Sequence, residues 1–491
     1  MDIVQQLFYG SHAKRNVAHS QDSMRRFIND NLHYDNGDYH MSRFVDRENE
    51  LKAIREKLMS GKFELIVIYG RRRVGKTRLI LEAVKDFPHI YYLAVEGDNL
   101  RHFREIARRA VPEVRYARED WESLLHALKG KVIIIDEFPN MIKEDSKVVS
   151  LLQRAVDLDL SNSNTKLVLL GSSVSMMTEK VLSYKSPLYG RRTGSMKLKP
   201  MEFFTLKEFF PEASWKELIE IYGLTDGIPF YITQVKLPFW EWLEKELFNP
   251  VSFFRDEVDF LLRYEFTETR TYKRILEAIA LGKTTPKEIK DFTGMRHSDI
   301  TPYLRNLIET DLVVREVPIT EKPSSKRGRY YLADNFLAFW FCYVYPNLSR
   351  IEEGTFDVAE IRENYNQYLG WVFEKVARQF LVRLARAGNL KFTKIGRWWH
   401  KDEEIDLVAL NEQEKKALFV EVKWKSLKER EARGILKDLE RKAGLVGLEG
   451  WEHCYGLIGK SIEGDERLKE EGWLVWDLEN FERFISSNDE V

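Results

Sequence analysis

The residues with the clearest chemical meaning lie in one glycine-rich string, GRRRVGKT, which runs from Gly70 to Thr77. It matches the pattern G-x-x-x-x-G-K-[ST] in full, with a strand-like segment before it and a helical one after it. The glycines let backbone N–H groups turn inward around phosphates, Lys76 can reach the outer phosphates, and the Thr77 hydroxyl can bind Mg²⁺. The following helix adds its positive end. The residues expected to contact a bound nucleotide are Gly70, Arg71, Arg72, Arg73, Val74, Gly75, Lys76, Thr77 and Arg78.

Two adjacent carboxylates follow a second apolar run. The segment KVIIIDEFPN places Asp136 and Glu137 at the carboxyl end of a predicted buried strand. Asp136 can hold Mg²⁺ through water, as the Walker-B aspartate does. Glu137 is placed to orient the attacking water as a general base.

Two further pairs of residues, one of serines and one of arginines, each allow two interpretations. The run KLVLLGSS brings Ser172 and Ser173 to the same sheet edge, where one serine senses the γ-phosphate or both only cap a helix. In PLYGRRTG, Arg191 or Arg192 could act as an arginine finger, and the alternative is an exposed, solvated pair. We take Ser172 and Arg191 as the site candidates.

A third group of candidate site residues, all charged, lies near the C-terminus. Glu404 and Asp406, and likewise Glu421 and Lys423, are two residues apart on predicted strands, so each pair shares a face. The short connection NEQEKKA predicts a hairpin that brings the pairs together. Asp406 and Glu421 then offer oxygen ligands for Mg²⁺, and Lys423 can position or activate water. The helix GWVFEKVARQF carries Glu374 as a third carboxylate ligand. The alternative is a hairpin with charges on its solvated face.

The elements that must position these residues form several units. Between residues 44 and 199, apolar strand-like runs alternate with amphipathic helices, which predicts a parallel sheet covered on both faces. Residues 200–265 are mainly helical. Three helical segments and two short strands in residues 270–332 suit a winged helix-turn-helix. From about residue 365, helix and strands form a second α/β unit.

Several of these motifs together resemble the archaeal-type ATPase family, a STAND branch of AAA+-like P-loop ATPases. The strings FVDRENEL, YGRRRVGKT, IIIDEF, LLGSS, PLYGR and TDGIPFYI follow that family's order, over residues 44–265. The resemblance implies a conformational switch driven by nucleotide, with ATP as that nucleotide. It also places Gly227–Pro229, and Pro229 in particular, in a helical lid that contacts the nucleotide.

The C-terminal unit resembles the PD-(D/E)xK, or restriction-endonuclease-like, nucleases. The match is GxxFE at Gly370–Glu374 followed by ExD and ExK, across residues 365–480. It implies metal-dependent cleavage of DNA. No proline precedes the aspartate and no downstream glutamine motif is evident, so the unit could instead be a catalytically inactive docking module. Trp398 and Trp399 precede the ExD strand and could stack on a nucleic acid, but they are expected to fill the core.

The middle unit carries the predicted contact with DNA. Its recognition helix would be Ser298–Glu309, and its wing Lys322–Arg329 is basic enough to neutralise phosphates. The alternatives are a packing module, or a regulator that acts through this unit alone. The exposed residues of the helix would be His297, Ser298, Thr301 and Arg305, and the basic residues of the wing are Lys322, Lys326, Arg327 and Arg329.

The predicted fold of this chain is therefore α/β and multidomain. The expected cofactors are ATP and Mg²⁺. Its partners are ATP, DNA, and a homo-oligomer or another protein. The predicted domains are an N-terminal extension (1–40), a P-loop ATPase core (41–200), a helical lid (201–265), a winged helix-turn-helix (266–335), and a helical connector with a nuclease-like domain (336–491).

Composition and charge exclude several other classes of protein and of binding site. With 491 residues and a net charge of −1, the chain exceeds one compact core and gives no global indication of a nucleic-acid partner. Its two cysteines, Cys342 and Cys454, form no CxxC pair, which argues against a zinc site. The apolar run Phe336–Tyr345 is too short to span a bilayer and predicts a buried helix or strand. We expect a cytoplasmic protein without a membrane partner, and translation could start at Met41.

Overall fold

The computed structural model describes residues 44–488. The expected N-terminal extension and the alternative start at Met41 lie outside the described residues, as do residues 489–491. The side chains of residues 297–299 and 485–488 are also not described. From Val45 onward the chain clusters as one unit.

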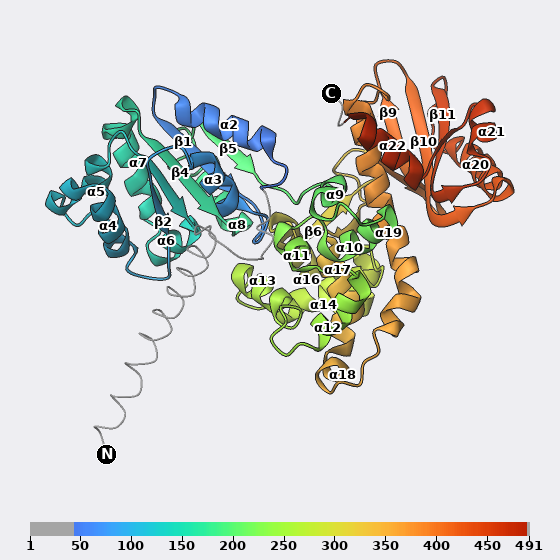
Figure 1. Cartoon of the computed structure of the whole chain (residues 1–491), viewed down its shortest axis with the longest axis horizontal. Helices are drawn as coiled ribbons and strands as arrows, with labels where there is room; N and C mark the ends of the chain where they lie inside the picture. Colours follow the sequence, from blue (N-terminus) through green and yellow to red (C-terminus); the bar gives the residue numbers. More distant parts are fainter. Residues whose placement is uncertain (1–43, 489–491) are drawn as a thin grey trace. The chain divides into compact units, whose positions relative to one another are not determined.

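A five-stranded parallel sheet in the order β2-β3-β4-β1-β5 forms the first part of the described chain (Figure 1). β1 and β4 are buried along nearly their whole length because they lie inside the sheet, as their apolar sequences predicted. Tyr69 pairs with Gly171 and Leu93 with Asp136, so the carboxyl ends of the strands meet at one edge. The strands are β1 (Glu64–Tyr69), β2 (His89–Leu93), β3 (Val132–Asp136), β4 (Lys166–Gly171) and β5 (Gly194–Lys197). The helices around them are α2 (Glu48–Met59), α3 (Lys76–Val84), α4 (Asn99–Ala110), α5 (Trp121–Ala127), α6 (Phe138–Glu144), α7 (Val148–Leu158) and α8 (Val174–Met176).

A helical region follows. A capping box between Ser214 and Glu217 begins its helix α10. After α10 the chain turns at Gly227, where φ is +70° and an added Cβ would lie 2.0 Å from the carbonyl oxygen of Met201. Only glycine fits this position, and the turn brings Pro229 to the start of α11. The helices are α9 (Leu206–Phe209), α10 (Trp215–Thr225), α11 (Pro229–Gln234), α12 (Phe239–Phe248) and α13 (Glu257–Glu265).

The middle unit has the predicted order of three helices and two strands. Its strands pair antiparallel, with Val313 opposite Leu332. The connection between them, residues 317–328, docks on the edge of the last sheet, because the Ile319 N–H donates to the carbonyl of Arg397 at 2.8 Å. The elements are α14 (Arg270–Ala280), α15 (Pro286–Thr293), α16 (His297–Glu309), β6 (Val313–Glu316) and β7 (Arg329–Leu332).

The last part of the chain is a second five-stranded sheet, in the order β12-β11-β10-β9-β8. β8, β9 and β10 run antiparallel, whereas β10, β11 and β12 run parallel. Pairing of Asn411 with Lys416 closes the predicted hairpin. The strands are β8 (Lys394–His400), β9 (Glu403–Asn411), β10 (Lys416–Leu427), β11 (Glu452–Ile462) and β12 (Leu474–Trp476). The helices of this part are α17 (Asn335–Phe339), α18 (Leu348–Glu352), α19 (Ala359–Arg386), α20 (Glu429–Ala443), α21 (Asp465–Glu470) and α22 (Leu478–Asn488).

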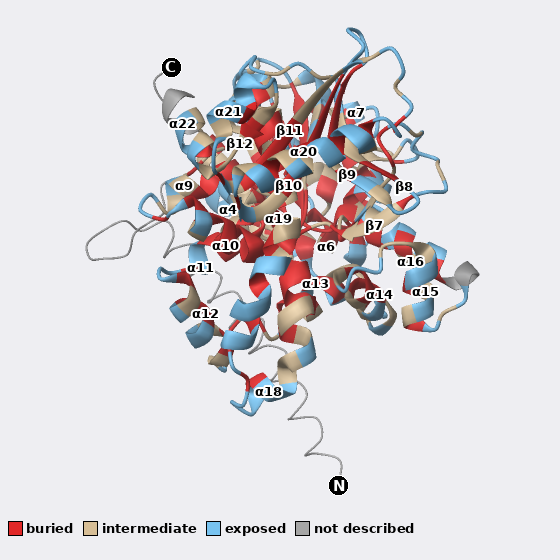
Figure 2. Cartoon of the chain, turned by 90° about the vertical axis from the view of Figure 1, so that its right-hand side faces the viewer, coloured by how far each residue is buried: buried red, intermediate tan, exposed pale blue. Residues whose placement is uncertain are grey.

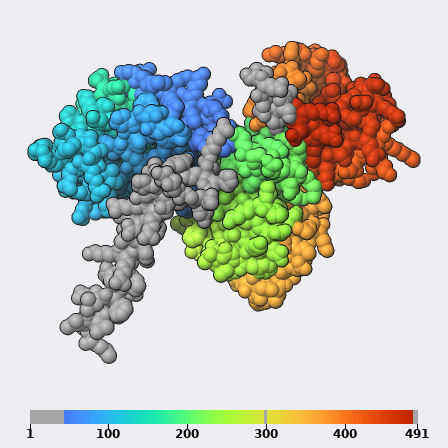
Figure 3. All heavy atoms as spheres, in the orientation of Figure 1, coloured from blue at the N-terminus to red at the C-terminus, as the bar shows by residue number. Residues whose placement is uncertain are grey.

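One hydrophobic core runs from the helical region through α19 into the last sheet, and includes Tyr222, Trp340, Phe380 and Ile458. Figure 2 shows this interior in red, with exposed residues on the outer faces of α12 and α18. In the space-filling view, the green helical region and the orange α19 are in continuous contact (Figure 3). The run that begins at Phe336 is buried and helical, as predicted. Among the described helices, none is long and apolar enough to cross a membrane.

Candidate functional site

The loop between β1 and α3 has the backbone shape that the glycine-rich string predicted. Three of its residues have positive φ: Gly70 at 147°, Arg73 at 71° and Gly75 at 93°. A Cβ at Gly70 would lie 2.3 Å from the carbonyl oxygen of Leu198, so only glycine fits there. α3 begins directly at Lys76, which puts its free N-terminal amides beside the loop. The loop can therefore present backbone N–H groups to phosphates.

The ammonium group of Lys76 folds back over this loop. Its Nζ donates to the carbonyl oxygens of Gly70 and Arg71, both at 2.9 Å, and the residue is almost fully buried. Burial lowers the pKa of Lys76, while the charges of Glu137 and Asp136 oppose that shift. A buried cation that has only two neutral acceptors is well placed to exchange them for phosphate oxygens.

Asp136 lies at the end of β3 and binds two hydroxyl groups. Its Oδ2 accepts from the Thr77 hydroxyl at 2.6 Å and from the Tyr91 hydroxyl at 2.8 Å. Burial and the neighbouring charge of Glu137 raise the pKa of Asp136 despite these donors. A hydroxyl and a carboxylate side by side are oxygen ligands of the kind that Mg²⁺ takes, so Thr77 and Asp136 fit the expected metal. No sequence signal identified Tyr91, which comes from the neighbouring strand β2.

Glu137 is held by donors from two separate elements. Its Oε1 accepts from the Ser172 hydroxyl, and its Oε2 accepts from the Ser172 N–H at 3.3 Å and the Tyr264 hydroxyl at 2.7 Å. Ser173 instead caps α8 through the Met176 N–H at 3.3 Å. The two serines therefore differ, since Ser172 contacts the predicted base and Ser173 caps a helix. Tyr264, from α13, was missed by the sequence because it lies in no recognisable motif.

The expected arginine finger is not at this site in the structure. Arg191 makes a bidentate contact with Asp157 of α7, with both distances at 3.0 Å. Arg192 donates to the carbonyl of Leu182 at 3.2 Å and lies over the ring of Tyr189. Neither arginine reaches the side chains that surround the loop, because nearer acceptors hold both guanidinium groups. Within this chain Arg191 is thus held by Asp157, and its role as an arginine finger remains a prediction.

The arginines of the loop itself do not all face the phosphate side. Arg71 is buried and pairs with Asp334, whereas Arg72 and Arg78 are exposed and Val74 is buried in the core. The side chains of Arg71 and Val74 are therefore directed into the protein, whereas Arg72 lies 5.9 Å from the ring centre of Tyr264 and so stays near Glu137. The predicted contacts of these residues with nucleotide remain a prediction.

The helical region touches the loop near its last glycine. A Cβ added at Gly75 would lie 3.8 Å from Cγ of Pro229, which places this predicted lid residue beside the loop. Arg73 lies 3.6 Å above the ring of Phe230 and 2.6 Å from the carboxylate of Glu257. Burial lowers the pKa of Arg73, and Glu257 opposes that shift.

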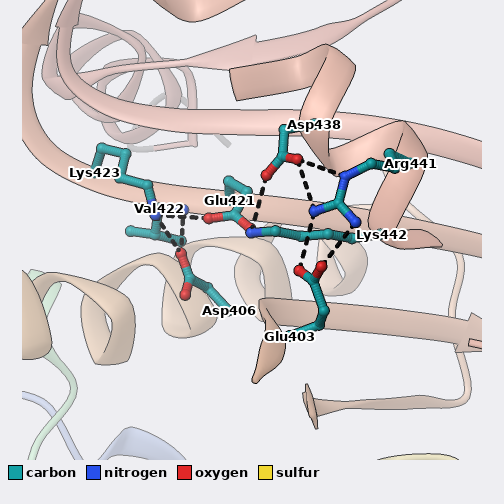
Figure 4. Close-up of polar contacts among 8 residues, drawn as sticks. All are labelled: Glu403, Asp406, Glu421, Val422, Lys423, Asp438, Arg441 and Lys442. Atoms are coloured by element: carbon teal, nitrogen blue, oxygen red, sulfur yellow. Dashed lines mark hydrogen bonds and ion pairs between the residues drawn. The ribbon is translucent and has the colours of Figure 1, made fainter. Parts of the chain in front are cut away.

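The hairpin of β9 and β10 assembles the C-terminal residues (Figure 4). Asp406 accepts from the Val422 N–H at 2.8 Å and from Lys423 Nζ at 3.1 Å, and the same Nζ lies 2.6 Å from Glu421. Burial and the charge of Asp406 raise the pKa of Glu421. Burial alone would lower the pKa of Lys423, but the two carboxylates outweigh it and raise the value. Two carboxylates with one shared lysine are thus brought together as predicted.

A second lysine, which the sequence did not indicate, completes this cluster. Lys442 of α20 lies 2.9 Å from Glu421 and 3.4 Å from Asp438 (Figure 4). Next to it, Arg441 bridges Glu403 and Asp438. Glu421 therefore accepts from an ammonium group on each side. This contact depends on the packing of helix α20 against strands β10 and β11, which local sequence patterns do not predict.

The predicted third carboxylate does not join the cluster. Glu374 of α19 pairs with Arg397 of β8, and Glu404 pairs with Arg329 at 3.0 Å. Within residues 44–488, no group of three or more His, Cys, Asp or Glu side chains has the geometry to hold a metal ion. Glu374 is held by Arg397 in this structure, and its role as a third ligand remains a prediction. Asp406 and Glu421 alone would still suffice for Mg²⁺, which keeps most of its waters.

The basic connection between β6 and β7 is largely occupied by the last sheet. Arg327 pairs with Glu321 and donates to the carbonyl of Trp399, and Arg329 binds Glu404. Lys322 and Lys326 remain exposed, as do Thr301 and Arg305 on α16, while the side chains of His297 and Ser298 lie outside the described residues. Two of the four basic side chains of the expected wing, Arg327 and Arg329, therefore contact other parts of the protein. Trp398 and Trp399 are buried, as expected for core residues.

Fold and site together define the class of a P-loop ATPase. Residues 44–235 match the family described as an ATPase domain predominantly from Archaea, and residues 340–435 match a family described as archaeal and bacterial proteins of unknown function. An uncharacterized protein of Methanocaldococcus jannaschii is 61% identical over 441 residues, which cover 89% of this chain and 100% of that protein. The chain belongs to the same family as this protein, with an ATPase domain of the archaeal type.

More distant likenesses were also found. An uncharacterized ATP-binding protein of M. jannaschii is 50% identical over 42 residues, covering 9% of this chain and 71% of that protein. A Walker-type ATPase of Pyrococcus abyssi is 22% identical, with a TM-score of 0.49, over 61% of this chain and 96% of its own. The Aeropyrum pernix ORC2 protein, solved in ADPNP–ADP complexes, is 18% identical, with a TM-score of 0.41, over 66% and 97% of the two chains.

Proposed function

We propose that this protein binds ATP with Mg²⁺ at the β1–α3 loop and hydrolyses it. The observation that carries the proposal is the 2.6 Å hydrogen bond between Thr77 and Asp136, beside a loop over which Lys76 is folded. Membership of an archaeal ATPase-domain family supports ATP as the nucleotide.

Each residue has a definite task in this reaction. Lys76 would exchange its two carbonyl contacts for phosphate oxygens, and Thr77 and Asp136 would hold Mg²⁺, which neutralises charge on the phosphates. Glu137 would accept the proton of the attacking water. Its side chain accepts three hydrogen bonds, which fill three of the roughly four acceptor positions of a carboxylate.

ATP turnover in the full chain tests this activity, with Lys76→Ala as the variant. Loss of one charged donor to phosphate should weaken ATP binding by roughly ten- to one-hundredfold. Lys85→Ala, at an exposed lysine just beyond α3, is the matched control. Equal ATP affinity and turnover in all three proteins would refute the proposal.

For the C-terminal part, we propose a restriction-endonuclease-like domain that cleaves DNA with a divalent metal. The supporting observation is the shared contact of Lys423 with Asp406 and Glu421 on an antiparallel hairpin. The two carboxylates would hold Mg²⁺, which activates water for attack on phosphorus. Lys423 would position that water or a phosphate oxygen. The unit from α14 to β7, a proposed winged helix-turn-helix, would help to present DNA.

The competing proposal is an ATP-dependent switch or DNA-binding regulator whose C-terminal domain is catalytically inactive. Two observations favour this proposal. Glu421 forms ion pairs with both Lys423 and Lys442, and Glu374 forms an ion pair with Arg397. In this case the C-terminal domain docks a protein or DNA, as a homo-oligomer or in a complex with another protein, and ATP toggles the assembled state.

Cleavage of circular and linear DNA separates the two proposals. The full chain is incubated with Mg²⁺ or Mn²⁺, with and without ATP, beside Asp406→Ala and the exposed-site control Glu412→Ala. Metal-dependent cutting that is lost only in Asp406→Ala would establish the nuclease. Cutting that persists in Asp406→Ala would exclude this site, and intact ATP turnover without any cutting would favour the switch.

A further inference from the structure

Helix α13 contacts three of the segments that build the phosphate site. At its start, Glu257 lies 2.6 Å from Arg73 of the loop. At its end, the Tyr264 hydroxyl donates to Glu137 at 2.7 Å, and Glu265 accepts from the Ser173 hydroxyl at 3.0 Å. One helix of the helical region therefore touches the loop, the end of β3 and the residues just after β4.

The contact with Glu137 has a fixed direction. Burial and the charge of Glu137 raise the pKa of Tyr264, so its hydroxyl stays protonated and donates. The ring is held independently, because Lys143 lies 4.8 Å from its centre. The hydroxyl is therefore an oriented donor, and removing it would leave the ring in place.

The Tyr264 hydroxyl contacts Glu137, the residue that the proposed reaction needs as a general base. Glu137 accepts three hydrogen bonds, two from Ser172 and one from Tyr264. Donors to a carboxylate stabilise its charged form and hold its lone pairs in fixed directions. A base held in this way has a fixed orientation, and it can turn toward a water molecule only by losing at least one of these hydrogen bonds.

Building on the proposed ATP hydrolysis, we propose that Tyr264 is a positioning residue that holds Glu137 in a resting orientation and so restrains turnover. Nucleotide would itself favour release of this contact. Glu265, at the same end of α13, accepts from the Ser173 and Ser175 hydroxyls just after β4, so the negative charge of phosphates bound beside the neighbouring loop would repel its ionised carboxylate. Movement of that end would withdraw the Tyr264 hydroxyl from Glu137.

Steady-state ATP hydrolysis and fluorescent-nucleotide binding by Tyr264→Phe test the inference. The substitution removes only the hydroxyl group. We expect kcat to rise by roughly three- to tenfold, the range for loss of one hydrogen bond, with KM and nucleotide affinity within about twofold of the wild type. In a Glu137→Gln background the same substitution should give no gain, since there is no base to release.

The matched control is Tyr272→Phe, because that hydroxyl also lies in a helix of this part and contacts Asn306 rather than the site. Its kcat should stay at the wild-type value. An unchanged or lower kcat in Tyr264→Phe, or a gain that persists without Glu137, would overturn the inference alone. A wild-type chain that binds ATP without turning it over would overturn the proposed hydrolysis, and the inference with it.

Discussion

Arg71 of the phosphate-binding loop forms an ion pair with Asp334, and the two side chains are only 8% and 1% exposed. Asp334 also begins α17, because its Oδ1 accepts from the Leu337 N–H at 2.7 Å. The segment that would surround phosphates is thus joined directly to the helix that follows the middle unit.

A second buried pair extends this connection. Asp226, which ends α10, pairs with Lys375 of α19, and the charge of Arg71 also acts on Asp226. On the same helix, Phe373 contacts Trp424 of β10, with ring centres 5.0 Å apart. Because β10 also carries the C-terminal candidate site, these pairs give the proposed coupling a physical route.

The Arg71–Asp334 pair predicts a large effect on stability. Asp334→Ala would leave the buried guanidinium of Arg71 without its paired carboxylate and would also remove the cap of α17, and we expect the free energy of unfolding to fall by about 3–5 kcal/mol. Chemical denaturation of the full chain measures this loss. Asp157→Ala, which breaks the exposed pair with Arg191, is the control and should change stability far less. Equal losses in the two variants would contradict the prediction.

A pH-dependent contribution is expected from Glu202, which joins the start of the helical region to α19. Burial raises the pKa of Glu202, but the hydrogen-bonded guanidinium groups of Arg386 and Arg383 outweigh it and hold the pKa below its usual value. A carboxylate with a lowered pKa in the folded state stabilises it above the unfolded-state pKa, and this contribution is lost as the pH falls through the folded-state value.

Glu202→Gln should therefore destabilise the protein at neutral pH, with the difference from the wild type shrinking as the pH falls below about 4.3, the ordinary glutamate pKa. Thermal unfolding between neutral and acidic pH measures it. The control is Glu353→Gln, at an exposed glutamate, which should show no such trend. A difference that is constant or grows toward acid would refute the assignment.

Local patterns predicted the parts of the site that lie within one strand–loop–helix unit. The glycine-rich string gave the loop beside Lys76 and Thr77, and the apolar run before Asp136 gave its place at the sheet edge. The hairpin likewise follows from alternation and a short connection. Arg191 could not be placed, because its partner Asp157 is set by packing between distant segments. The same holds for Tyr264, which reaches Glu137 across 127 positions of sequence.

Domain packing set a further limit on the sequence prediction. The basic residues before β7 suggested a DNA-contacting wing, and nothing in their spacing indicated that Ile319 would join the core of the last sheet. β8 was also not recognised, because its tryptophans interrupt the alternation of a half-buried strand. Contacts of this kind depend on the complete fold.

The C-terminal cluster allows a prediction about metal affinity. Lys442 and Lys423 both bind Glu421, so a divalent cation must compete with two ammonium groups for that carboxylate. Lys442→Met removes one competitor without changing either proposed ligand. We expect Mn²⁺ to bind this variant about tenfold more tightly, the size of one charge-assisted hydrogen bond.

Calorimetric titration with Mn²⁺ in the absence of nucleotide measures the change, and the loop of the ATPase domain is the same in every protein compared. Lys437→Met, at an exposed lysine of the same helix, is the control and should bind Mn²⁺ as the wild type does. Asp406→Asn should weaken binding, because it replaces a charged ligand with a neutral one. Weaker binding in Lys442→Met would contradict competition and would mean that Lys442 holds Glu421 in the orientation the metal requires. The sign of the change therefore decides whether the second lysine opposes or supports a metal centre.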